Sequence, residues 1–106
     1  MVEYNDRINL VFDSLGHHIR RDILRRVAEC ELSISELAKP YAMSFAAVAK
    51  HIDKLSIAGL IHKRREGKQY LISLEPLALL VAQKELEKYA NAMNARFDAL
   101  EDLLKK

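Results

Sequence analysis

Hydrophobic residues recur at helical spacing in the first 30 residues of the chain. In residues 3–15, large apolar side chains recur at spacings of four, three, one and three and form one stripe: Tyr4, Ile8, Val11, Phe12 and Leu15. Gly16 interrupts this pattern. A second helix is predicted over residues 18–29, with an apolar face and a set of arginines that we expect to project outward: Arg20, Arg21, Arg25 and Arg26.

Two further helices are predicted between residues 33 and 58, separated by a turn. Ser33 and Glu36 form an S-x-x-E capping box, which starts a short helix that ends near Pro40. Ser44 supplies the N-cap oxygen of the next helix, which runs to about Ala58. The predicted core stripe of that helix has spacings of three, four and three: Phe45, Val48, Ile52 and Leu55.

The pattern changes from helical to alternating after Gly59, a candidate left-handed C-terminal cap. Residues 60–64 and 69–74 are predicted to be strands, and Gly67 supplies the turn between them. After Pro76 a long helix is predicted to run to the end of the chain, with its own apolar stripe. A helix-turn-helix followed by a β-hairpin is the element order of a winged-helix domain. The predicted fold class is therefore mainly α with a small β-hairpin.

Charge is distributed unevenly along these elements. Residues 44–74 contain six basic and two acidic residues, whereas residues 75–106 contain five basic and six acidic residues. The positive charge thus lies on the second helix of the pair and on the hairpin, the elements that would contact phosphates. We take double-stranded DNA as the expected partner.

Several other classes of protein are disfavoured. The sequence contains no Gly-rich phosphate loop, no paired acids beside a histidine and no nucleophile elbow, so we expect neither an enzyme nor a cofactor. No apolar run reaches the roughly 18 residues of a membrane span, and no cleavable leader is evident. The single cysteine, Cys30, excludes an internal disulfide and fits a reducing compartment, so a cytoplasmic location is predicted.

The segment SLGHHIRRDILRRVAECELSISELAKPYAMSFAAVAKHIDKLSIAGLIHKRREGKQYLISL resembles the ArsR-type winged helix-turn-helix transcriptional regulators. The resemblance is close over about residues 14–76. It implies a single domain over residues 1–106, in which residues 14–76 bind DNA and residues 1–13 and 77–106 form dimerisation helices. Members of this family are mostly homodimeric repressors that bind palindromic operators.

The chain departs from the metal-sensing members of that family. Where those members have two cysteines in an ELCVCDL-like motif, this chain reads ELSISEL, with Ser33 and Ser35 in the cysteine positions. Serine hydroxyls are poor ligands for soft metals. The last helix also contains no histidine, since His62 is the final one. We therefore expect no metal site, and a regulator of the non-metal branch.

The resemblance and the charge pattern together give a candidate DNA-binding surface. It combines the recognition helix (about 44–58) with the basic wing (about 60–74). We expect the alanines to allow close approach and the basic residues to contact phosphates or guanine. The candidate residues are Ser44, Ala46, Ala47, Lys50, His51, Lys54, Lys63, Arg65 and Lys68.

The apolar stripes of the terminal helices are expected to form a homodimer. A final helix of roughly 30 residues would span ~45 Å, which is longer than a small winged domain can cover. The candidate interface residues are Ile8, Val11, Phe12, Leu86, Tyr89, Met93, Phe97, Leu100 and Leu104.

Three questions stay open from the sequence. One alternative is a metal-responsive repressor with atypical ligands, for which His17 and His18 are candidates. Another is a winged-helix module that binds proteins rather than DNA, although its recognition face would be expected to be neutral or acidic. An effector of unknown chemistry could also regulate DNA binding from a site near the dimer helices.

Overall fold

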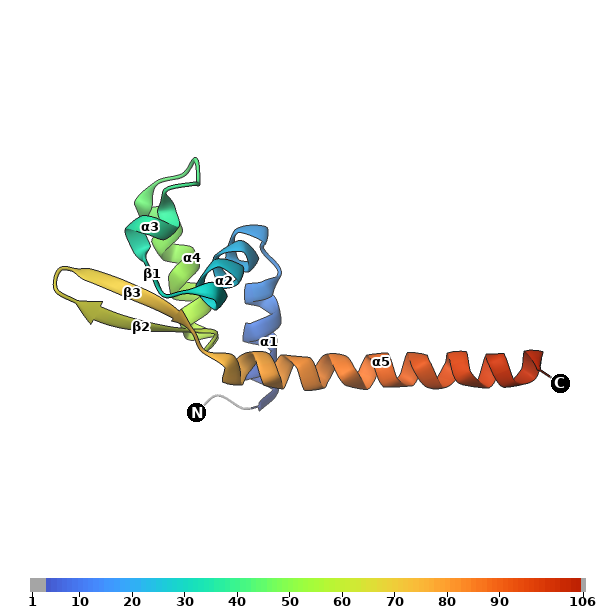
Figure 1. Cartoon of the computed structure of the whole chain (residues 1–106). Helices are drawn as coiled ribbons and strands as arrows, with labels where there is room; N and C mark the ends of the chain where they lie inside the picture. The colour runs from blue at the N-terminus through green and yellow to red at the C-terminus, as the bar shows by residue number, and fades with distance from the viewer. Residues whose placement is uncertain (1–3, 106) are drawn as a thin grey trace.

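The computed structural model describes residues 4–105, which form a helical body, a three-stranded antiparallel sheet and a protruding C-terminal helix (Figure 1). The winged helix-turn-helix architecture predicted from the sequence is confirmed. The elements in chain order are α1 (Tyr4–Leu15), α2 (His18–Glu29), β1 (Leu32–Ser33), α3 (Ile34–Ala38), α4 (Phe45–Ile57), β2 (Ile61–Glu66), β3 (Gln69–Leu74) and α5 (Pro76–Leu104). The predicted start of the first helix at residue 3 lies outside the described residues.

The predicted helix ends are set by local hydrogen bonds. Ser33 Oγ accepts from the Glu36 backbone N–H at 3.1 Å, and Glu36 Oε1 accepts from the Ser33 N–H at 3.0 Å, so the capping box is present. Ser44 Oγ caps α4 by accepting from the Ala47 N–H at 3.1 Å. Gly59 follows α4 with φ +76°, a left-handed conformation that glycine adopts without strain.

The hydrophobic core lies where α2, α3 and α4 meet the sheet. Val48, Ile52 and Leu55 of α4 have no exposed surface, which confirms three positions of its predicted stripe. The other large, fully buried side chains come from α2, α3, the turn before β2, and β3: Ile23, Leu37, Leu60 and Ile72. These contacts between distant segments fix the orientation of α4 relative to the hairpin.

The structure corrects three predicted positions. Phe45 is predicted in the core stripe, but it is 55% exposed at the first position of α4. Ile8 and Val11 are predicted at a dimer interface, yet only 8% and 2% of their surfaces are exposed in the single chain. They pack within the body, where α1 contacts α2, α4 and α5, so they have little surface left for a second subunit.

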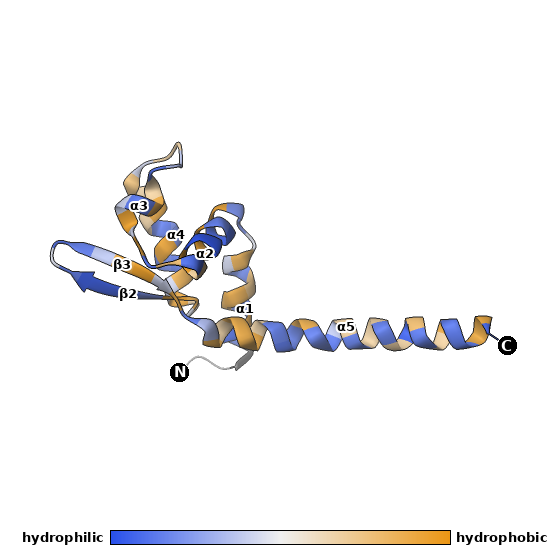
Figure 2. Ribbon diagram, in the orientation of Figure 1, coloured by the Kyte–Doolittle hydropathy of each residue, from blue (hydrophilic) through white to orange (hydrophobic). Residues whose placement is uncertain are grey.

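The sheet has the strand order β1-β3-β2, and the first of these strands is not predicted by the sequence pattern. It contains only Leu32 and Ser33, too few residues to show alternation, and it forms by pairing Leu32 with Ile72 of β3. Strands β2 and β3 make the wing, and Gly67 at φ +62° forms its tip. Figure 2 shows β2 as strongly hydrophilic.

Helix α5 packs against α1 only near its beginning and then leaves the body in the direction opposite to the wing (Figure 1). The described part of the chain therefore measures 67 × 35 × 21 Å. Apolar and polar residues alternate along the whole exposed length of α5 (Figure 2). Among the described residues, no helix is both long and apolar enough to cross a membrane.

Candidate nucleic-acid interface

The outward face of α4 carries the first part of the candidate site. Val48, Ile52 and Leu55 face the core, so the helical period directs Lys50 and Lys54 away from it. Both lysine side chains are exposed. Within residues 4–105, neither forms a hydrogen bond or an ion pair, and their ammonium groups can therefore approach an anionic ligand.

The beginning of α4 is exposed and carries small side chains. Ser44 and Ala46 are exposed, and Ala47 is half-buried. The Ser44 hydroxyl already accepts the capping hydrogen bond, which leaves its own proton available to a partner. Phe45 lies among these residues but is absent from the predicted site, because its sequence position assigned it to the core stripe.

His51 lies on the side of α4 that faces α2, not on the face shared by Lys50 and Lys54. It is half-buried, its Nδ1 accepts from Arg20 Nη1 at 3.2 Å, and its ring centroid is 4.5 Å from that of His17. The structure thus gives His51 partners within the protein, and its contact with DNA stays a prediction. One helical step of about 100° separates it from Lys50, and this step turns it toward the protein.

Arg20 is expected from the sequence to project outward, but it is only 7% exposed. Its Nε donates to the Ser14 carbonyl at 2.7 Å and its Nη2 to the Asp13 carbonyl at 3.1 Å. The last carbonyls of α1 have no partner within that helix, so Arg20 satisfies them and joins the end of α1 to α2. Its hydrogen bond to His51 also joins α2 to α4.

This arrangement makes folding stability depend on pH. Burial first, and then the charge of Arg20 and the neighbouring histidines, lower the pKa of His17 and of His51 below the ordinary value of 6.5. Between the lowered pKa values and 6.5, the unfolded chain binds more protons than the folded chain. Stability therefore rises with pH through this window and falls on acidification.

We predict a smaller free energy of unfolding at pH 5 than at pH 7, measured by urea denaturation. The double variant His17→Asn/His51→Asn should show a weaker dependence over this range, since asparagine retains an acceptor but does not titrate. The matched control is His62→Asn on the exposed face of the wing. An unchanged pH dependence in the double variant would contradict the assignment.

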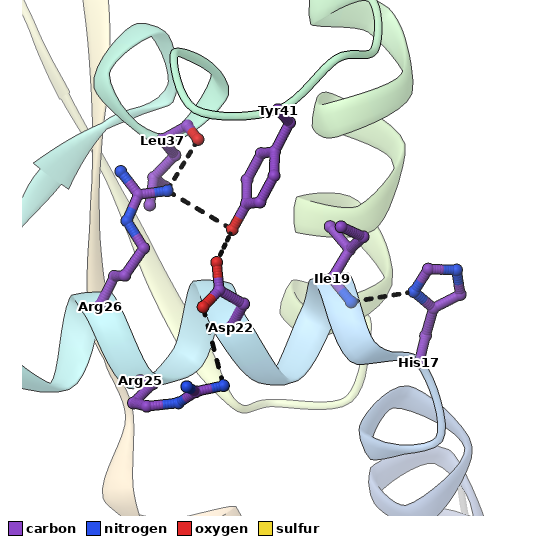
Figure 3. Close-up of polar contacts among 7 residues, drawn as sticks. All are labelled: His17, Ile19, Asp22, Arg25, Arg26, Leu37 and Tyr41. Carbon is purple, nitrogen blue, oxygen red and sulfur yellow. Dashed lines mark hydrogen bonds and ion pairs between the residues drawn. The ribbon is translucent and has the colours of Figure 1, made fainter.

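A polar network fixes the turn before α4 (Figure 3). Tyr41 Oη donates to Asp22 Oδ2, and burial together with this bond raises the pKa of the phenol. Arg26 donates to the carbonyls of Leu37 at 2.8 Å and Glu36 at 3.0 Å, and its guanidinium lies 5.7 Å from the centroid of the Tyr41 ring. These bonds satisfy the C-terminal carbonyls of α3 and tie the helix-turn-helix to α2.

The wing places its basic residues on two faces. Lys63 and Arg65 share a face with Tyr70, at 5.4 Å and 5.9 Å from the ring centroid, and this face turns toward α4. Lys63 also pairs with Asp53 of α4 at 3.2 Å. Arg64 points to the other face and pairs with Glu31 at 2.7 Å and Glu66 at 3.3 Å. Strand alternation explains this division.

The structure therefore brings some predicted site residues together and separates others. Lys50 and Lys54 lie exposed on α4, Arg65 and Lys68 lie exposed on the wing, and the Lys63–Asp53 pair links the two elements. Because Lys63 is half-buried and already paired, its ammonium group is less available to a ligand than those of the other four. The charged surface consists of two separate elements held at a fixed orientation.

Within the described part of the chain, no group of three or more His, Cys, Asp or Glu side chains is arranged to hold a metal ion. His17 and His18 do lie together, with ring centroids 4.9 Å apart. However, His17 Nδ1 accepts from the Ile19 N–H at 3.1 Å and serves as the N-cap of α2 (Figure 3).

A regulator from Mycobacterium tuberculosis, the HTH-type transcriptional regulator Rv2034, is 30% identical to this chain over 78 residues. The match covers 74% of this chain and 73% of that protein. The crystal structure of an ArsR family transcriptional regulator, 26% identical, superposes with a TM-score of 0.81 and covers 89% of this chain and 97% of its own. The chain belongs to the ArsR family of transcriptional regulators.

The fold of this ArsR-family regulator is also found in a more distant structure. The homodimeric winged helix-turn-helix DNA-binding domain Mb0332 from Mycobacterium bovis is 23% identical, with a TM-score of 0.64 and coverage of 84% of each chain. No family model matches the sequence. Family membership identifies α3 and α4 as the helix-turn-helix and β2–β3 as the wing of a DNA-binding domain.

Proposed function

We propose that this ArsR-family regulator acts as a homodimeric repressor that binds an inverted-repeat operator. One observation carries the proposal. The exposed side chains of Lys50 and Lys54, which pair with no described residue, lie on the outward face of α4, beside a wing whose exposed Arg65 and Lys68 are also basic. A B-DNA major groove admits one α-helix, and phosphates flank it on both sides. Lysines on the recognition helix and basic side chains on the wing match that charge pattern.

Dimerisation is supported by the apolar stripe of α5. Six large side chains on one face of this helix are more than half exposed in the single chain: Leu86, Tyr89, Met93, Phe97, Leu100 and Leu104. Burying each contributes about 1.5–3 kcal/mol. Two such stripes together outweigh an association cost of about 4–15 kcal/mol. The M. bovis domain, which shares the fold, is itself described as homodimeric.

A two-fold symmetric dimer presents two copies of α4. For both to enter major grooves on one side of the duplex, the half-sites must be about one helical turn apart, ~34 Å. The operator is thus an inverted repeat. Location in the cytoplasm and control by an effector stay predictions.

The proposal is tested by selecting bound sequences from a random pool of double-stranded DNA. We expect enrichment of an inverted repeat, with affinity that falls steeply between about 50 and 200 mM salt. Recovery of unrelated sequences, or binding that does not respond to salt, would contradict sequence-specific operator binding. In that case the protein-binding module would be the better explanation.

A further inference from the structure

The first turns of α4 carry an unusual set of side chains for a helix that reads DNA. Residues 44–49 read Ser-Phe-Ala-Ala-Val-Ala, with no amide, carboxylate or guanidinium group among them. These are the groups that recognise adenine, cytosine and guanine through paired hydrogen bonds. Apart from the Ser44 hydroxyl, this part of the helix offers only apolar contacts.

Phe45 is the largest side chain in this segment, and most of it is uncovered. It is the first residue of α4 and is 55% exposed, while Val48 and Ile52 fill the core without it. An aromatic residue is also a mediocre helix former, so the start of α4 gains little from it. Neither the core nor the helix accounts for an exposed phenyl ring at this position.

The position of Phe45 is one from which recognition helices contact bases. In helix-turn-helix proteins the N-terminal residues of the recognition helix reach the base edges. Helical side chains tilt toward the N-terminus, so the ring of the first residue lies beyond the end of the helix. Ala46 beside it is exposed and small, which lets the backbone approach the groove closely.

The major groove contains one apolar group, the C5-methyl of thymine. We propose that Phe45 determines specificity by packing against a thymine methyl in each half-site of the operator. The inference rests on the proposed function and adds to it the base that the start of α4 recognises. Lys50, five residues further along and about 140° around the helix, supplies the charged contact that Phe45 lacks.

The test uses operators obtained by selection, in which each symmetry-related pair of thymines is replaced in turn by deoxyuridine. This change removes the methyl and leaves base pairing intact. We expect one symmetric pair of positions at which the substitution weakens binding about tenfold, because one methyl is absent from each half-site. Fluorescence anisotropy gives the affinities.

The variant Phe45→Ala should bind more weakly and lose this sensitivity, because the partner of the methyl is gone. Ile57→Ala is the matched control: Ile57 is 70% exposed at the opposite end of the same helix, and its replacement should leave the deoxyuridine effect unchanged. Thermal denaturation checks that both variants fold.

Two results would overturn the inference. In the first, no deoxyuridine substitution weakens binding of the wild-type protein. In the second, the Phe45→Ala variant retains the full deoxyuridine effect. Either can occur while the wild-type protein still selects an inverted repeat with salt-dependent affinity. Failure of the proposed function is different, because then no operator is selected at all.

Discussion

Replacing Lys50 and Lys54 with alanine is expected to weaken operator binding at least about 100-fold at 0.1 M salt. The dimer loses four cationic side chains, and each phosphate contact contributes up to roughly a factor of eight to the affinity at this salt concentration. Both lysines are exposed and unpaired within residues 4–105, so their removal leaves no carboxylate without a partner. The fold and the dimer should therefore be unaffected. Anisotropy titrations at several salt concentrations measure the change.

The salt dependence separates local contacts from a general reduction of charge. The slope of log affinity against log salt should decrease by about 0.9 for each phosphate that the variant no longer neutralises. The control variant Lys84→Ala/Lys105→Ala removes the same charge from exposed positions on and just after α5 and should change the slope little. Equal effects of the two double variants would exclude a direct role for the outward face of α4.

The second large effect is expected from the apolar stripe of α5. The double variant Met93→Glu/Phe97→Glu places four carboxylates in a dimer interface and removes four apolar side chains, each worth about 1.5–3 kcal/mol. The dimer dissociation constant should rise by at least about four orders of magnitude, since 1.4 kcal/mol corresponds to a factor of ten. Sedimentation at micromolar concentration should then show a monomer.

A monomer covers one half-site only, so this variant should also lose specific binding to the inverted repeat. The control Asn91→Glu/Ala95→Glu introduces the same charge at the same spacing on the opposite face of α5, where both residues are exposed. It should remain dimeric and bind DNA. A Met93→Glu/Phe97→Glu protein that is still dimeric would show that the dimer forms elsewhere.

The differences between prediction and structure at Phe45 and His51 have a common origin. Periodicity places Phe45 on the face shared by Val48, Ile52 and Leu55, and the direction is right, but at the first position of α4 its side chain is 55% exposed. Similarly, position 51 is polar and lies near the basic residues, yet His51 contacts Arg20 of a different helix. A periodic pattern gives the direction of a side chain; only the neighbouring elements decide whether something covers it.

For the arginines of α2 too, the neighbouring elements decide which side chains face the solvent. Spacing alone makes Arg20 and Arg26 solvent-facing, whereas both satisfy backbone carbonyls at the ends of α1 and α3. Helix ends leave such carbonyls without partners, and a long guanidinium side chain can reach them from another element. The identity of the acceptor depends on how the helices pack.

The sequence by itself determined the order of the helices and of the two wing strands, because caps, glycines and hydrophobic spacing are local signals. Ser33, Ser44 and Gly59 set helix ends through neighbours within five residues along the chain. The tertiary structure alone decided which charges remain free. Lys63 is paired with Asp53, Arg64 with Glu31 and Arg20 with carbonyls of α1, whereas the side chains of Lys50 and Lys54 form no hydrogen bond or ion pair with any described residue. Such pairings join segments that are distant in sequence, so their geometry exists only once the chain has folded.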